Sequence, residues 1–123
     1  MFWFRAQAAQ QQVDDPDFKV TVANPAYSQK GPTVGIDEAH SNFHTASGRY
    51  RPFAELLQSD GYRVRSVARR IDAATLAKVD VLVIANALGD KAQPGSAAFP
   101  EAECDILRDW VRGGGGLLLV ADH

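Results

Sequence analysis

Two short segments of this sequence place a carboxylate next to a histidine. Asp37 and His40 follow one apolar run, and Asp122 and His123 follow another. Carboxylates and imidazoles that converge can coordinate a divalent metal ion or transfer protons. These four residues are therefore the candidate catalytic residues, and the sequence does not identify a cofactor or establish that a metal binds.

Four further polar residues are candidates for ligand binding because they lie near the same apolar runs: Glu38, Asn42, His44 and Asn86. Each has a structural alternative. Carboxylates often cap loops and histidines often bond to the backbone, and this explanation is favoured for any single residue. His44 follows Phe43 in a polar loop, where packing and ligand binding are equally good explanations. Only the set as a whole indicates a site.

The hydrophobic pattern predicts the strands that position these residues. Unbroken apolar runs at 81–85 and 117–121 are typical of parallel strands buried on both faces. The segment 62–67 alternates apolar and polar residues, which predicts a more exposed edge strand, and 33–37 completes a set of four.

Between these strands the pattern predicts three helices, at 51–60, 72–78 and 100–112. Pro52 suits the first turn of the first helix and Gly61 its end, and Asp72 can cap the second. In the third helix, which Gly113 ends, an apolar face is predicted from Cys104, Ile106, Leu107, Trp110 and Val111. The single cysteine is therefore expected to be a core residue rather than a reactive thiol.

Strands that alternate with helices predict an α/β protein. We expect a three-layer, flavodoxin-like parallel sheet with strand order 2-1-3-4. Ligands bind such sheets outside the carboxyl ends of the strands, so the candidate residues should share one rim. Asp37, His40, Asp122 and His123 should then approach a common point.

The last strand raises a separate expectation. A run of three leucines and a valine at 117–120 should not form a bare sheet edge, because bare apolar edges promote aggregation. We therefore expect the natural protein to continue beyond His123, with the fold truncated after the fourth strand, or another chain to cover this edge.

Composition excludes several classes of protein. The net charge of −2 and the scattered arginines do not form the basic stripe of a nucleic-acid-binding protein. No apolar run approaches the roughly 20 residues of a membrane span. Residues 37–40 spell the helicase sequence Asp-Glu-Ala-His, but no phosphate-binding loop precedes them, which argues against an ATPase.

The first 31 residues differ from the rest of the chain. Apolar residues 2–4 and the small-residue segment Ala6-Gln7-Ala8 are similar to the end of a secretory signal peptide. We interpret 1–31 as a signal-peptide remnant and an extended leader, and we expect a secreted or periplasmic protein. The alternative is a disordered arm of a cytoplasmic protein.

Four sequence blocks carry a family resemblance: residues 36–44, 48–57, 81–88 and 110–123. Together they resemble the class I glutamine amidotransferase-like superfamily, and more closely its uncharacterised, often exported bacterial members. The resemblance covers about residues 13 to 123 and implies that 32–123 is the N-terminal part of such a domain. In true amidotransferases a nucleophilic cysteine follows the glycine-rich strand, and this chain has Ala121 there. The resemblance therefore implies that glutamine hydrolysis through a cysteine is not the activity.

These observations leave three functions open. The first is a binding domain that recognises a small ligand or a cell-envelope partner at the rim of the sheet. The second is a hydrolase that uses the Asp and His residues of the rim, with or without a metal ion. The third is a structural module of the envelope. The sequence does not indicate the oligomeric state.

Overall fold

The computed structural model describes residues 12–28 and 30–121 and contains four strands and three helices within them. The strands are β1 (Thr33–Asp37), β2 (Arg63–Val67), β3 (Val81–Ala85) and β4 (Gly116–Val120). The helices are α1 (Arg51–Ser59), α2 (Ala73–Leu76) and α3 (Glu101–Arg112). These elements confirm the predicted ones, with small differences at their ends.

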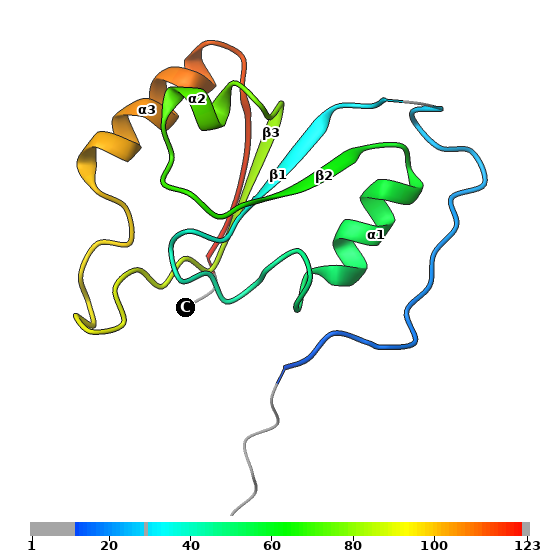
Figure 1. The fold of residues 1–123 in the computed structure, drawn as a ribbon, viewed down its shortest axis with the longest axis horizontal. Helices are drawn as coiled ribbons and strands as arrows, with labels where there is room; N and C mark the ends of the chain where they lie inside the picture. The colour runs from blue at the N-terminus through cyan, green and yellow to red at the C-terminus, as the bar shows by residue number, and fades with distance from the viewer. Residues whose placement is uncertain (1–11, 29, 122–123) are drawn as a thin grey trace, which may run out of the picture.

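All four strands are parallel and lie in the order β2-β1-β3-β4, as predicted (Figure 1). The central strand β1 pairs along its full length with β2, and β3 pairs along its full length with β4. This parallel α/β sheet has the flavodoxin-like order. None of the helices in the described part of the chain combines the length and the hydrophobicity that a membrane span needs.

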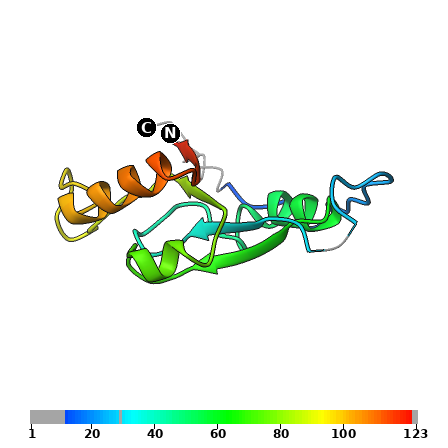
Figure 2. The ribbon, with the colours of Figure 1, turned by 90° about the horizontal axis from the view of Figure 1, so that it is seen from above.

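Helices cover both faces of the sheet (Figures 1 and 2). On the face of α2 and α3, the core contains Ile71, Leu76, Leu82, Ile84 and Leu107. On the face of α1, a smaller core contains Val34, Ile36, Ala54 and Val83. Successive residues of a strand point to opposite faces, so Asp37 faces α3 and its neighbour Ile36 faces α1.

Capping residues set the starts and ends of the helices where the sequence predicts. Asp72 accepts a hydrogen bond from the Thr75 N–H at 2.7 Å and so caps α2. Gly61 follows α1 with φ +93°, a left-handed conformation that favours glycine. After α3, Gly115 lies so close to the Trp110 ring that an added Cβ would come within 2.3 Å of it. The glycine therefore lets the chain turn tightly beneath the helix into β4.

The burial predicted for β4 is wrong. Leu117, Leu118 and Leu119 are exposed, Leu119 by 62%. The reason is position: β4 is the last strand of the sheet, so only β3 pairs with it within the described residues. The hydrophobic run identifies a strand correctly, but it cannot say which side of that strand has a neighbour.

The predicted core position of Cys104 is also wrong, because this thiol is exposed. The face of α3 that meets the core carries Glu103 and Leu107, with Ile106 and Trp110 partly buried against it. Cys104 lies on the side of α3 that faces β4 instead, together with the exposed Val111. The helix is thus rotated by about one residue from the predicted orientation, since Glu103 has a buried partner beneath it.

The described part of the leader lies against the α1 side of the domain (Figure 1). The Tyr27 ring packs edge-on against the Tyr62 ring at 5.1 Å, and the Tyr27 N–H donates to the Asp60 carbonyl. Arg51 pairs with Asp14 at 2.5 Å. These contacts hold the described part of the segment beside the domain.

Candidate functional site

A chain of charged side chains crosses the carboxyl end of the sheet beneath α3. It begins at Asp37, the last residue of β1, whose carboxylate is fully buried. This carboxylate accepts hydrogen bonds from the Asn42 amide at 2.9 Å and from the Ala39 N–H at 3.2 Å. Burial of a carboxylate is costly unless it is hydrogen-bonded, and these two donors supply such bonds.

The next member is the nearly buried His40, which lies between two carboxylates. Its Nδ1 is 2.9 Å from Asp37 Oδ2, and its Nε2 is 2.6 Å from Glu103 Oε2. A neutral imidazole has one N–H and can donate to only one of them. Which of the two carboxylates accepts from a neutral ring therefore depends on the tautomer of His40. His40 also packs against the Phe99 ring, with the ring centres 4.1 Å apart.

Glu103 connects this chain to solvent. Its other oxygen, Oε1, is 3.2 Å from Nε of Arg70, whose side chain is 75% exposed. The four groups Asp37, His40, Glu103 and Arg70 are hereafter called the ionic chain. The imidazole lies between two carboxylates, and one of these also meets the guanidinium, so each buried polar group of the ionic chain has a partner.

The ionic chain forms one wall of a surface hollow of about 450 Å³. Its other walls include Gly89, Asp90 and Pro100, from the segment between β3 and α3. This hollow, hereafter the His40 hollow, therefore presents a cation at Arg70 and a carboxylate at Asp90. It lies outside the carboxyl ends of parallel strands, where α/β proteins bind ligands.

Two predicted ligand-binding residues act mainly on the loop that carries His40. The Asn42 side chain accepts a bond from the His40 N–H at 3.0 Å, in addition to its bond to Asp37. Glu38 accepts from the Ala46 N–H at 2.8 Å and from the Ser66 hydroxyl at 3.0 Å. Asn42 therefore supports the ionic chain, whereas the carboxylate of Glu38 is engaged with the loop and with β2.

The other two, His44 and Asn86, meet each other. Asn86 Nδ2 lies 3.3 Å from His44 Nε2, and the His44 ring stacks on Tyr50 with 4.5 Å between the ring centres. Asn86 follows β3 with φ +45°, and its carbonyl accepts from the Phe43 N–H. This contact joins the long loop after β1 to the end of β3, separately from the ionic chain.

The structure thus brings Asp37 and His40 together, as the sequence predicts. The predicted partners Asp122 and His123 lie outside the described residues, so their approach to the ionic chain stays a prediction. Within residues 12–28 and 30–121, no group of three or more histidine, cysteine and acidic side chains is arranged to hold a metal ion.

Two members of the ionic chain, Glu103 and Arg70, are missed by the sequence analysis. Glu103 had a detectable signal, because it precedes Leu107 and Trp110 by four and seven residues. An acidic residue on the core-facing stripe of a helix needs a buried partner. Arg70 had no such signal, since its role depends only on the position of the loop after β2.

The fold and the site together define an α/β protein with a flavodoxin-like parallel sheet and a charged hollow at the carboxyl ends of its strands. Comparison of the chain with protein-family models, with curated proteins and with solved structures finds no match.

Proposed function

We propose that this chain is a ligand-binding α/β domain similar to the glutamine amidotransferase-like superfamily, and that its ligand is a small polar molecule in the His40 hollow. The ionic chain is the observation that supports this proposal. It extends from a fully buried carboxylate to an exposed guanidinium at the wall of the hollow. Such a network holds its polar groups in fixed positions, which specific binding requires.

The charges of the hollow favour a ligand that itself carries both signs. Arg70 can bind a carboxylate, and Asp90 on the facing segment can bind an ammonium group. Free amino acids combine these groups in one small molecule. We therefore propose amino acids or similar zwitterions as the ligand class, in preference to a cell-envelope partner.

Titration with glycine, L-glutamine and L-glutamate, followed by amide NMR shifts, tests this proposal. We expect shifts confined to the His40 hollow, around Gly89 and Asp90, and a roughly five-fold weaker affinity in Arg70→Gln. Arg112→Gln removes an equally exposed arginine from the far end of α3 and is the matched control. Absence of local shifts with all three compounds contradicts the proposal.

A second candidate is a hydrolase, and the position of the His40 ring between the carboxylates of Asp37 and Glu103 favours it. In acid–base catalysis, a carboxylate often orients the imidazole through one ring nitrogen, while the other ring nitrogen donates or accepts a proton. In this alternative Asp37 is the positioning residue, and His40 with Glu103 supplies the proton. Asp122 and His123 would act with them, with or without a divalent metal ion.

Chromogenic ester, amide and phosphomonoester substrates, assayed across pH with and without zinc or manganese, test the hydrolase. Glu103→Gln retains hydrogen bonding but cannot exchange a proton, so it should abolish turnover while the circular dichroism spectrum is kept. Asp122→Ala and His123→Ala should do the same. Turnover that survives Glu103→Gln contradicts this mechanism.

Export is the third part of the proposal, and residues 1–31 support it through their similarity to the end of a signal peptide. Fusion of these residues to a reporter enzyme that folds only outside the cytoplasm tests it. Reporter activity is expected with the natural segment and not after substitution of Phe2, Trp3 and Phe4 by aspartate. Equal activity from both fusions contradicts export.

A further inference from the structure

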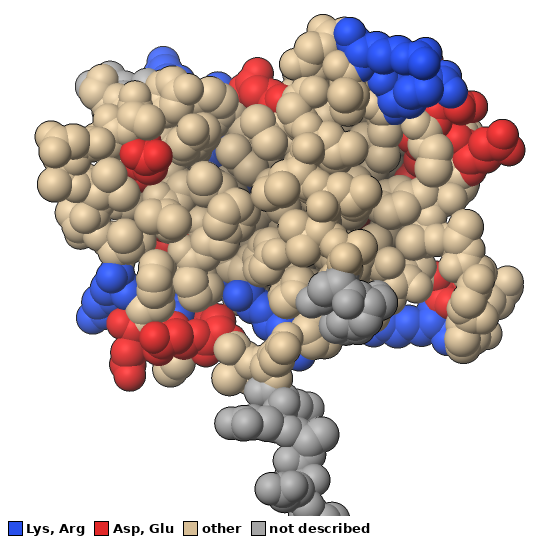
Figure 3. Space-filling model, turned by 180° about the vertical axis from the view of Figure 1, so that it is seen from behind, with Lys and Arg blue, Asp and Glu red and all other residues tan. Residues whose placement is uncertain are grey.

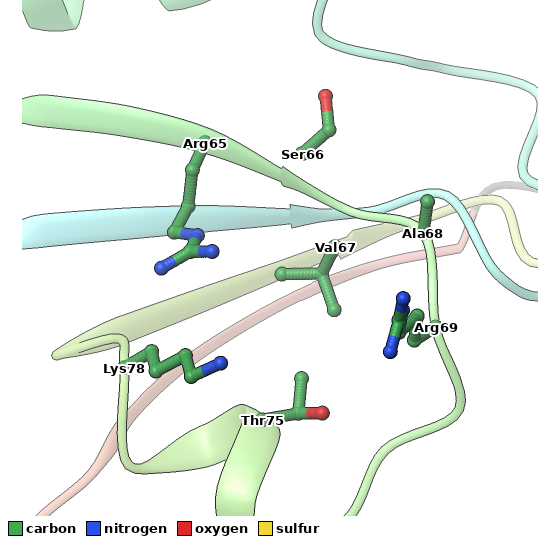
Figure 4. Close-up of a pocket in the computed structure, with 7 residues that line it drawn as sticks. All are labelled: Arg65, Ser66, Val67, Ala68, Arg69, Thr75 and Lys78. Atoms are coloured by element: carbon green, nitrogen blue, oxygen red, sulfur yellow. The ribbon is translucent and has the colours of Figure 1, made fainter.

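Three cationic side chains surround a second hollow, between β2 and α2 (Figure 4). They are Arg65, Arg69 and Lys78, and the hollow measures about 410 Å³. We infer that this cation hollow binds the phosphate group of a small phosphorylated molecule. The inference is independent of the His40 hollow and of the function proposed for it.

The three cations reach the cation hollow from different elements. Arg65 lies in β2, Arg69 in the loop after it, and Lys78 in the turn between α2 and β3. Strand alternation places Arg65 on the same face as the buried Val67, which lies among them (Figure 4). The convergence is therefore a product of the fold, because these residues are as many as 13 positions apart in the sequence.

The cations of the cation hollow differ in their ion pairing from the other arginines of the described chain. Four other arginines of the described chain form ion pairs with carboxylates: Arg51, Arg70, Arg108 and Arg112. Across residues 12–28 and 30–121, no ion pair within 4.0 Å involves Arg65, Arg69 or Lys78. Three neighbouring cations repel one another, and a bound anion relieves this repulsion.

Asp72, an acidic residue close to Lys78 in sequence, has another role. Asp72 caps α2, and its pKa is lowered mainly by the backbone hydrogen bond from Thr75, with only a minor contribution from Lys78. It is therefore engaged with the helix rather than with the cations. Thr75 also lines the hollow, and its hydroxyl donates a long hydrogen bond of 3.4 Å to the Arg70 carbonyl. The same proton can be donated to a phosphate oxygen when that long bond is given up.

Phosphate suits this arrangement better than a carboxylate does. A phosphomonoester carries close to two negative charges at neutral pH and presents three acceptor oxygens, so it can meet three cations at once. The whole chain has a formal charge of −2, so general attraction for polyanions is weak. Binding should depend on these three side chains and not on net charge.

The cation hollow and the His40 hollow are neighbours. Ala68 lines both hollows. Of the two residues that follow it, Arg69 lines the cation hollow and Arg70 lines the His40 hollow. The two sites nevertheless share no charged residue. A failure of amino-acid binding through Arg70 would therefore leave the phosphate inference intact, and the reverse also holds.

Titration of the 123-residue chain with inorganic phosphate and with phenyl phosphate, followed by NMR, tests the inference. We expect millimolar binding with shifts at Arg65, Arg69, Thr75 and Lys78. Substitution of each cation by glutamine should raise the dissociation constant roughly three-fold, and the triple variant should lose binding. Arg112→Gln is the matched control. All three side chains are exposed, so the substitutions should not disturb the core.

Two results would overturn the inference. One is an affinity for phosphate that the triple variant shares with the wild type. The other is co-sedimentation with phosphatidylglycerol vesicles through these cations when neither soluble phosphate causes shifts, which would identify a lipid surface as the partner. A loss of binding in Arg112→Gln equal to that in Arg65→Gln would contradict a defined site in the same way.

Discussion

The sheet ends on one side in β2 and on the other in β4, and the two edges differ in chemistry. The exposed positions of β2 include Arg63, Arg65 and Ser66, whereas those of β4 are three leucines. Figure 3 shows the side of the molecule on which β4 lies, where charged atoms gather mainly toward the margins. Between α3 and β4 the surface is apolar, lined by Phe99, Leu117 and Leu119 among others.

The difference shows how charge protects a strand edge. An unpaired strand offers its backbone to other strands, and charged side chains on that edge oppose such pairing. The arginines of β2 do so and also supply one cation of the cation hollow. The described part of β4 has no charged residue, so nothing in its chemistry opposes a partner.

The first prediction, with the largest expected effect, concerns β4. The chain should self-associate through β4. The double substitution Leu118→Lys with Leu119→Lys should weaken association at least about a hundred-fold, since each lysine puts a charge where association would bury apolar area. Sedimentation velocity measures this. Leu56→Lys, on the exposed side of α1, is the control and should leave association unchanged. A wild type that stays monomeric at high concentration contradicts the prediction.

The second prediction separates two neighbouring residues of the helix beside β4. Glu103→Ala removes one partner of the buried ionic chain and should lower the free energy of unfolding by about 3 kcal/mol. Cys104→Ser, one residue later but exposed, should change it by less than about 0.5 kcal/mol. Urea unfolding of both variants tests this contrast. Equal effects would mean that the ionic chain does not hold α3 on the sheet.

A third prediction makes the β2 edge resemble the β4 edge. Arg63→Leu together with Arg65→Leu should strengthen self-association several-fold, because it removes the charges that protect this edge. Light scattering at matched concentrations measures the change. Arg63→Lys with Arg65→Lys keeps the charge and should behave as the wild type. Association that rises in both variants would show that charge is not the protecting feature.

The smallest expected effect concerns α2, on the β2 side. The pKa of Asp72 is lowered, chiefly by the bond from the Thr75 N–H. A lowered folded-state pKa means that the cap stabilises the fold above the unfolded-state pKa, and that this stability is lost as pH falls through the folded-state value. Asp72→Ala should therefore lower Tm slightly near neutral pH and lose its effect in acid. A Tm difference independent of pH contradicts the role of the charge.

The sequence by itself determined the parallel sheet, its strand order and the pairing of Asp37 with His40. These follow from local information, because hydrophobic periodicity and capping residues act over a few positions. It also predicts a candidate site at the carboxyl ends of the strands, where the structure places Asp37 and His40, since that rule depends only on strand direction.

Only the tertiary structure decided which apolar and charged residues have neighbours. The hydrophobic pattern predicts that Leu117 to Leu119 are core residues, yet they are exposed because β4 lies at the edge of the described sheet. The joining of His40 to Glu103, 63 residues away in sequence, depends on the rotation of α3 over the sheet. Burial and ion pairing are properties of the packed chain, and the residue pattern of one segment does not show which other segments pack against it.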